Sequence, residues 1–164
     1  MPKNEIINIR SDSEDWRGAI LSNLANIPFT IGDYSFKSVE SALQGIKFFD
    51  QKEREEVFKM NGLDALKAGR KVTKSIIPGS THYVFWNNKM IEYNSIEHRL
   101  LIAMFISEKI RQNIKVQKAL SMTHGAFIYH DVGVENPNTS LPEKFYIEIL
   151  LAQRRLLKKL KSIK

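Results

Sequence analysis

Ser-Val-Glu-Ser-Ala-Leu-Gln-Gly-Ile-Lys-Phe-Phe, residues 38–49, has the periodicity of an amphipathic helix. At about 100° per residue, Glu40, Gln44 and Lys47 share one narrow polar stripe. Ser38 suits an N-cap, and the helix dipole is expected to keep Glu40 ionised. Such stripes also occur on ordinary solvated helix faces, so spacing alone does not define a site. The opposite face is expected to pack on a core and comprises Val39, Ala42, Leu43, Ile46 and Phe49.

Composition is that of a soluble globular protein. The chain has 164 residues, with 43% hydrophobic and 26% charged, which fits one domain over residues 1–164. The sequence has no cysteine, which excludes disulfides, thiolate nucleophiles and cysteine-rich zinc sites. No two of the four histidines have the i,i+4 spacing of a helical metal site. We therefore expect neither a metal nor another cofactor.

Charge and hydropathy bear on location and partners. Residues 1–5 lack the apolar run of a signal peptide, and no stretch has the length of a membrane span. We expect a cytoplasmic protein without membrane contact. The net charge of +7 comes mostly from residues 154–164, which contain lysines and arginines but no acid. We expect this basic end to be the solvated part of a terminal helix, with nucleic-acid binding as the alternative.

The remaining pattern predicts a mainly α (α+β) fold, a single compact helical domain with a small N-terminal β-element. Residues 5–10 and 127–129 are predicted strands, and residues 27–36 a hairpin around Gly32-Asp33. In the longest helix the predicted apolar face comprises Ile96, Leu100, Leu101, Met104, Phe105 and Ile106. The final helix is expected to bury Phe145, Ile149, Leu150, Leu156 and Leu157. Predicted helices cover residues 38–49, 51–60, 64–71, 95–111, 114–122 and 143–161.

An ordered series of short motifs resembles the NADAR, or YbiA-like, family. The series follows the family's order LSN, pF, SvE, Q and KF at similar spacing. It runs Leu21-Ser22-Asn23, Pro28-Phe29, Ser38-Val39-Glu40, Gln44 and Lys47-Phe48. Later segments are similar to the family too: Ala68-Gly69, Trp86, Ser95 with Glu97-His98, Lys109, Gln112-Asn113, Ala119-Leu120, Thr139-Ser140-Leu141-Pro142, and Ile149-Leu150 with Arg154. The resemblance covers nearly the whole chain, from about Ile7 to Leu157.

The resemblance implies an N-glycosidase that breaks the bond between a ribose and a base-like nitrogen. One branch of the family hydrolyses phosphorylated ribosylamino-pyrimidine intermediates of riboflavin synthesis, and another removes ADP-ribose from guanine in nucleic acid. The implied partner is a small molecule containing ADP-ribose or ribose phosphate, with ADP-ribosylated nucleic acid as a further candidate. Residues 130–135 replace the acidic Trp-Gly loop of riboflavin-type members, which favours an ADP-ribose-related reaction.

Two residues of the stripe are candidates for the chemistry. Glycosidic cleavage passes through an oxocarbenium-like centre at the anomeric carbon. We expect Glu40 to place negative charge near that carbon and to orient a water. Lys47 is expected either to protonate the leaving base or to form an imine, the latter requiring a pKa lowered by burial. The alternative is a structural Glu40–Lys47 ion pair without a catalytic role.

Candidate binding residues flank this pair. Ser22 and Asn23 precede the hairpin, and the Asn23 amide is expected to bind ribose hydroxyls or to serve the turn itself. Gln44 is expected to bind ribose or to support its helix. Trp86 offers a face for stacking a flat base, with a core or rim position as the alternative.

The loop after residue 129 and the N-terminal segment supply the remaining candidates. His130 is a candidate donor near the site. Asp131 or Glu135 is a candidate replacement for the acidic residue of riboflavin-type members. Arg10 and Arg17 are candidate phosphate ligands.

Two rival functions compete with the N-glycosidase. One is a non-catalytic module that binds NAD or ADP-ribose. The other is a basic helical nucleic-acid-binding protein, which rests on residues 154–164 alone.

Overall fold

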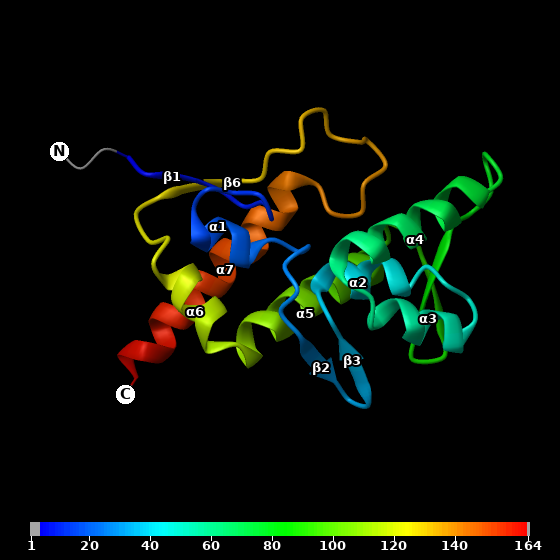
Figure 1. Cartoon of the computed structure of the whole chain (residues 1–164), viewed down its shortest axis with the longest axis horizontal. Helices are drawn as coiled ribbons and strands as arrows, with labels where there is room; N and C mark the ends of the chain where they lie inside the picture. The colour runs from blue at the N-terminus through cyan, green and yellow to red at the C-terminus, as the bar shows by residue number, and fades with distance from the viewer. Residues whose placement is uncertain (1–3, 164) are drawn as a thin grey trace.

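The computed structural model describes residues 4–163 (Figure 1). Helices dominate and the strands are short, which confirms the predicted mainly helical α+β fold. In this part of the chain the helices are α1 (Trp16–Leu21), α2 (Val39–Gly45), α3 (Gln51–Phe58), α4 (Gly62–Ser75), α5 (Ile96–Gln112), α6 (Ile114–Ser121) and α7 (Glu143–Ser162). The strands are β1 (Ile6–Asn8), β2 (Phe29–Ile31), β3 (Tyr34–Phe36), β4 (Tyr83–Trp86), β5 (Lys89–Glu92) and β6 (Phe127–Tyr129).

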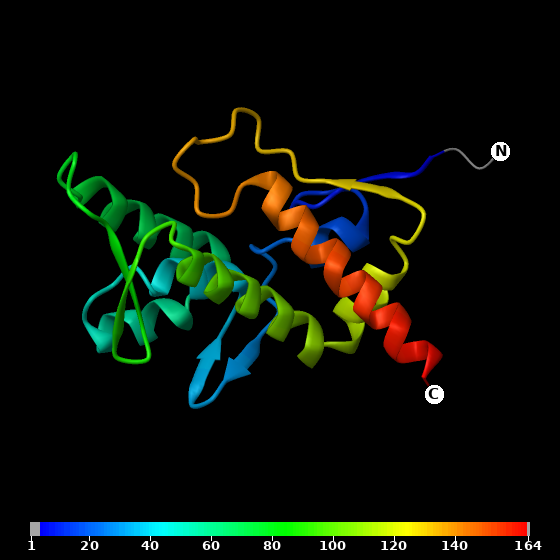
Figure 2. The same ribbon diagram turned by 180° about the vertical axis from the view of Figure 1, so that it is seen from behind.

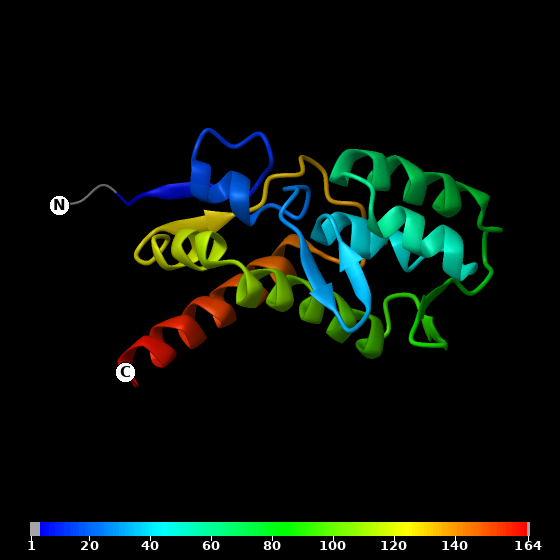
Figure 3. The ribbon, with the colours of Figure 1, turned by 60° about the horizontal axis from the view of Figure 1, so that its bottom comes forward.

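Helix α5 runs through the middle of the molecule and separates two groups of elements (Figures 1 and 2). On one side α2 packs against α3 and α4, and these two helices lie side by side in Figure 3. On the other side α1 packs against α6 and β1. Helix α7 packs against α5, α6 and β6 and so closes the back of the molecule.

The strands form three separate two-stranded sheets. β1 pairs in parallel with β6, with Ile7 opposite Ile128, so the β-structure is not confined to the N-terminal part. β2 and β3 form the predicted hairpin, in which Gly32 takes a φ of 56°. β4 and β5 form a second hairpin through Asn87 and Asn88, with φ of 49° and 60°. Positive φ at both central residues is typical of a type I′ turn, in which asparagine is favoured.

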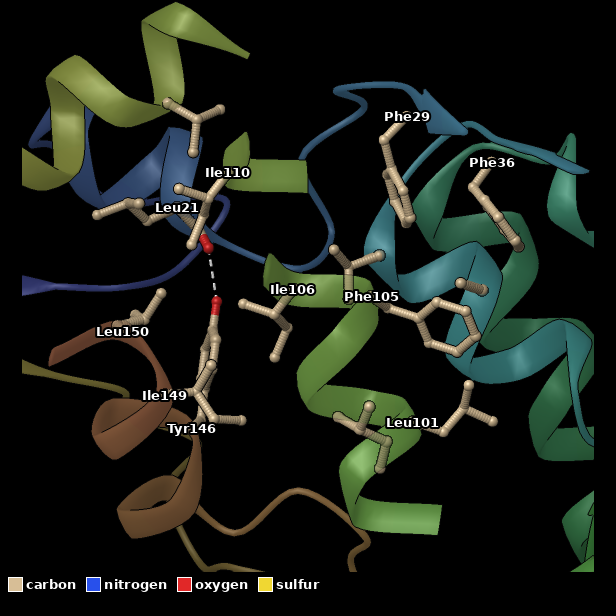
Figure 4. Close-up of a cluster of buried hydrophobic side chains, with 14 of the residues drawn as sticks. Leu21, Phe29, Phe36, Leu101, Phe105, Ile106, Ile110, Tyr146, Ile149 and Leu150 are labelled. Carbon is tan, nitrogen blue, oxygen red and sulfur yellow. Dashed lines mark hydrogen bonds between the residues drawn. The ribbon is translucent and has the colours of Figure 1, made fainter. Parts of the chain in front are cut away.

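The core follows α5 along its length (Figure 4). At one end aromatic rings pack together: the centroids of Phe29 and Phe36 lie 4.9 Å apart, and those of Trp86 and Phe105 lie 5.3 Å apart. At the other end Tyr146 of α7 is buried among aliphatic side chains, including Leu21 and Ile110. The two ends of the core hold the two groups of helices against α5.

The predicted helix over residues 38–49 is too long. α2 ends at Gly45, and the next hydrogen bonds run from Lys47 N to Gln44 O and from Phe48 N to Gly45 O, as in a tighter 3₁₀ turn. The turn redirects Phe49, which is 80% exposed and lies edge-on to Phe85 instead of facing the core. Lys47 therefore lies after the helix, not on its stripe.

Other predicted core positions are also wrong. Ile96 and Leu100 are 81% and 65% exposed, because the covered face of this part of α5 carries His98, Leu101 and Ile102 instead. Leu156 of α7 is exposed as well. The cap of α5 is Ser95, whose hydroxyl accepts the N–H of His98. In the described part of the chain, no helix is apolar over a length that would span a bilayer.

Candidate active site

The first turn of α2 is fixed by its own cap and by the chain that precedes the hairpin. Ser38 is the N-cap, as predicted: its hydroxyl accepts the N–H of Ser41 at 3.0 Å, and the Ser41 hydroxyl accepts the N–H of Ser38 at 3.0 Å. This reciprocal capping box satisfies two buried donors. The N–H of Glu40 donates to the carbonyl of Asn23 at 2.9 Å. The Ser22-Asn23 turn is thereby joined to the residue that carries the candidate catalytic carboxyl group.

Residues 20–23 are held through four consecutive carbonyl groups. Lys109 Nζ donates to the carbonyl of Ile20 at 2.7 Å and to that of Ser22 at 2.8 Å. The Tyr146 hydroxyl donates to Leu21 O at 2.5 Å, drawn as the dashed line in Figure 4. Glu40 N completes the set. The side-chain amide of Asn23 forms no hydrogen bond within residues 4–163. The backbone of Asn23 is therefore anchored, while its side chain is available to a ligand.

The Glu40 carboxyl group lies in a largely dry environment. Gln44 Nε2 donates to Glu40 Oε1 at 2.6 Å. Burial raises the pKa of Glu40, opposed by the Gln44 hydrogen bond and by the charges of Lys47, Arg70 and His130. Loss of solvent therefore outweighs the favourable contacts in setting the pKa of Glu40, an effect that the helix-dipole argument does not include. A carboxyl group with a raised pKa is suited to proton transfer near neutral pH.

Gln44 is fixed by the close approach of α4. It is 8% exposed, and its Oε1 atom is buried without a hydrogen-bond partner among residues 4–163. A Cβ atom at Gly69 would lie 1.7 Å from this oxygen. Only glycine at position 69 leaves room for the amide in the orientation that supports Glu40.

Lys47 lies close to Glu40 without pairing with it. Its Nζ atom donates to Thr73 Oγ1 of α4 at 3.3 Å, and no Glu40–Lys47 ion pair occurs within the described residues. The pKa of Lys47 is lowered by burial, with the Glu40 charge opposing and the Arg70 charge adding. The structural ion pair considered above is thus not formed. The lowered pKa increases the fraction of neutral amine, as an imine-forming lysine requires.

His130 directly follows β6 and lies near enough to Glu40 for its charge to act on that carboxyl group. Its Nδ1 atom lies 2.6 Å from the carbonyl oxygen of Ile9. A carbonyl only accepts, so Nδ1 carries the proton and Nε2 is left for another partner. The ring lies edge-on to Tyr146 with centroids 5.2 Å apart, and its charge acts on the pKa of Glu40.

Two of the predicted binding residues, Trp86 and Ser22, are buried and contact other parts of the protein. Trp86 is 8% exposed and packs on Tyr34, Phe36 and Phe105, so most of its ring is covered. It also borders an open hollow of about 390 Å³ next to the β2–β3 turn. The buried Ser22 hydroxyl accepts the N–H of Leu24 at 3.2 Å.

The predicted phosphate ligands of the N-terminal segment are engaged by acids. Arg10 pairs with Asp12 at 2.9 Å beside an open hollow of about 410 Å³ that is lined by several carboxylates. Arg17 pairs with Asp15 and Glu5 and donates to the carbonyl of Met122. Within residues 4–163, neither guanidinium forms a hydrogen bond or ion pair with Glu40.

The side chains of Asp131 and Glu135, in the loop after β6, accept hydrogen bonds from backbone N–H groups. The exposed Asp131 accepts the N–H of Gly133 at 2.9 Å. Glu135 accepts the N–H of Glu143, the first residue of α7, at 2.7 Å. The structure therefore brings together Asn23, Glu40, Gln44, Lys47 and His130 from the predicted set, whereas the side chains of Trp86, Arg10 and Asp131 have other partners.

The sequence did not single out Tyr146, Arg70 or a site role for Lys109. Tyr146 shares one face of α7 with Ile149 and Leu150, so its spacing indicates burial but not a hydrogen bond to a distant loop. Lys109 has the spacing of an ordinary polar residue. Among residues 4–163, no three His, Asp or Glu side chains are clustered so as to hold a metal ion.

The fold and sequence of the whole chain are similar to those of known proteins. The chain has the fold of the E. coli protein YbiA, whose NMR structure superimposes with a TM-score of 0.67 over 98% of this chain and 89% of that one, at 19% identity. Residues 15–155 match the family described as bacteriophage protein GP30.3, to which the chain belongs. An uncharacterized 17.1 kDa protein of the Gp30-rIII intergenic region of enterobacteria phage T4 is 28% identical over 146 residues, which cover 88% of this chain and 93% of that protein.

Proposed function

We propose that this protein is an N-glycosidase that hydrolyses a ribose–base C–N bond, with ADP-ribosylated guanine or a related NAD- or ADP-ribose-derived compound as substrate. One observation carries the proposal: Glu40 and Lys47 lie within electrostatic reach of each other, with a raised and a lowered pKa respectively. Opposite shifts of this kind suit a pair of groups that exchange protons during a reaction.

The two groups divide the work of cleavage. As the bond from the anomeric carbon to the base nitrogen breaks, the ionised Glu40 stabilises the positive charge on the sugar. In one route the Lys47 ammonium protonates the departing nitrogen, and a water held by Glu40 attacks the anomeric carbon and gives its proton to Glu40. In the other route the neutral Lys47 amine attacks that carbon and displaces the base, which takes the proton that the amine releases. The bond from the anomeric carbon to the ring oxygen then opens to give an imine, and water hydrolyses this imine to the free sugar and the Lys47 amine.

The surrounding charges support a phosphorylated substrate. Lys47, Arg70 and His130 all act on the single carboxyl group of Glu40, so cationic side chains outnumber acidic ones at this point. Asn23 and Gln44 add amides that match ribose hydroxyl groups. A ribose carrying phosphate has the complementary charge.

Release of ADP-ribose from ADP-ribosylated guanine, in DNA and as the free nucleoside, tests the proposal. Glu40→Gln and Lys47→Ala are expected to lower kcat at least about 100-fold, the usual effect of losing a general acid or base. Glu56→Gln and Lys52→Ala, exposed on α3, are the matched controls and are expected to behave as wild type. Reduction with borohydride during turnover separates the two routes, because only the imine route links the sugar covalently to Lys47.

Two outcomes would redirect the proposal. Tight binding of ADP-ribose without turnover, unaffected by Lys47→Ala, would make the protein a binding module. Turnover of a ribosylamino-pyrimidine phosphate in place of ADP-ribosylated guanine would move it to the riboflavin-type reaction.

A further inference from the structure

A second group of polar side chains lies beyond Lys47, where the β4–β5 hairpin meets the first turn of α5. The N–H of Phe85 donates to the carbonyl of Ile46 at 2.7 Å, which ties this hairpin to the residue before Lys47. His82 stacks on Tyr93 with centroids 4.4 Å apart and an angle of 14° between the rings. Tyr93 in turn contacts His98, with centroids 4.9 Å apart. The Lys47 charge acts on the pKa of both histidines, so the group adjoins the candidate active site.

Three polar atoms in this group are buried without a hydrogen-bond partner among residues 4–163: His82 Nε2, Asn94 Oδ1 and Arg99 Nε. Buried polar atoms are rarely left unpaired, since each costs about 1–3 kcal/mol. Asn94 also takes a φ of 64°, a left-handed conformation that asparagine tolerates, and its amide nitrogen donates to the carbonyl of Asn138 at 3.3 Å. A concentration of unpaired atoms on adjoining elements is the pattern of a site prepared for a polar ligand.

Arg99 gives this group its charge. Its guanidinium lies 5.8 Å from the ring centroid of Phe145 at the start of α7, a contact that restricts its orientation. No acidic side chain pairs with Arg99 in the described part of the chain. Besides burial, His82 and Arg99 both act on the pKa of His98, so the imidazole of His82 and the unpaired guanidinium border the same ring. Burial lowers the pKa of His82, so its ring is neutral at neutral pH, and in the tautomer with a proton on Nε2 this unpartnered atom donates to a ligand oxygen. A guanidinium and an imidazole N–H in one group suit the oxygens of a phosphate group.

We propose that Arg99 and His82 bind the phosphoryl group of the substrate, and that Asn94 Oδ1 accepts a hydrogen bond from a ribose hydroxyl. This subsite rests on the proposed function. With the sugar of the substrate against Glu40 and Lys47, the phosphate would lie at Arg99 and His82. The subsite assigns to these residues the recognition of the phosphate in the proposed substrate, whether a monoester or the diphosphate of ADP-ribose.

Calorimetry with ribose, ribose 5-phosphate, ADP-ribose and inorganic phosphate tests the subsite without needing turnover. Wild type is expected to bind ribose 5-phosphate at least about tenfold more tightly than ribose. Arg99→Gln is expected to remove this advantage and Arg99→Lys to keep part of it. Arg155→Gln, an exposed residue of α7, is the matched control and should bind as wild type. ADP-ribose bound more tightly than ribose 5-phosphate would identify the diphosphate as the preferred ligand.

The subsite is overturned if wild type binds ribose and ribose 5-phosphate equally, or if Arg99→Gln retains the preference for the phosphorylated sugar. The N-glycosidase would survive that result, since Glu40→Gln and Lys47→Ala test it separately by turnover. If Arg99→Gln does not fold, the imidazole NMR signals of His82 and His98 in wild type replace it. A shift of these signals with ribose 5-phosphate but not ribose supports the subsite, and identical responses to both overturn it.

Discussion

The hydroxyl of Tyr146 in α7 donates a 2.5 Å hydrogen bond to the carbonyl oxygen of Leu21, 125 positions earlier in the chain. Together with Lys109 of α5 and the N–H of Glu40 in α2, this contact attaches residues 20–23 to three helices. The segment that carries Asn23 is thereby held by hydrogen bonds from three separate helices. Under the proposed function, such a support would hold the ribose in a fixed position against Glu40.

Tyr146→Phe is expected to destabilise the protein by about 1–2 kcal/mol, since it leaves the buried Leu21 carbonyl without this donor. Urea unfolding measures the change. Tyr83→Phe serves as the control, because its hydroxyl has no hydrogen bond within residues 4–163. Equal stability of the two variants would show that the Tyr146 hydroxyl contributes no net free energy.

Lys109 is expected to make stability depend on pH. Burial lowers its pKa from 10.5 to about 7, so the unfolded chain binds more protons than the folded one between these values. The free energy of unfolding should therefore rise with pH across this window, by up to about 1.4 kcal/mol per unit, and this contribution is lost as pH falls through 7. Lys109→Met should make the rise smaller, leaving the part that the lowered pKa of Lys47 contributes, whereas Lys118→Met, exposed on α6, should keep the whole rise. Parallel pH profiles for wild type and Lys109→Met would contradict the assignment.

Gly69→Ala is expected to displace the Gln44 amide, because the new Cβ atom would lie 1.7 Å from Gln44 Oε1. We expect a loss of about 1–3 kcal/mol in stability, as for overpacked cores, and a lower kcat as Glu40 loses its hydrogen bond. Truncation of Gln44 to alanine removes the clash, so the double variant should be more stable than Gly69→Ala alone. Additive effects of the two substitutions in this double-mutant cycle would refute the contact.

Glu40→Gln is expected to be more stable than wild type at pH 8 while being less active. The pKa of Glu40 is raised in the folded state, so that state binds more protons and stability falls as pH rises above the ordinary value of 4.5. A glutamine has no charge to bury and escapes this loss. The stability advantage of Glu40→Gln should therefore be present at pH 8 and vanish near pH 4. Thermal unfolding at both pH values measures it, with Glu56→Gln as the control that should show no such gap.

Local chemistry made much of the fold predictable. The cap at Ser38, the hairpin turn at Gly32-Asp33 and the helix predicted over residues 114–122 each depend on a few neighbouring residues. The structure agrees with each, and α6 ends at Ser121. Phe49 and Leu100 were misplaced because periodicity indicates an apolar face without showing which of its positions other elements cover.

The candidate site was predictable only in part, for the same reason. Asn23, Glu40, Gln44 and Lys47 lie in one stretch of sequence, whereas Tyr146, Lys109 and Arg70 reach the site through tertiary packing. The pKa of Glu40 also depends on burial by distant elements, which local dipole arguments do not include.

The pairing of β1 with β6 constrains the order in which the molecule acquires its structure. β1 has no strand partner until residues 127–129 have been synthesised, and His130 takes its position from the same pair. Closing so long a loop is entropically costly and slows folding. The helices of the middle segment are therefore expected to form while the chain is still being made, and the reactive centre to be completed only when its second half joins the first.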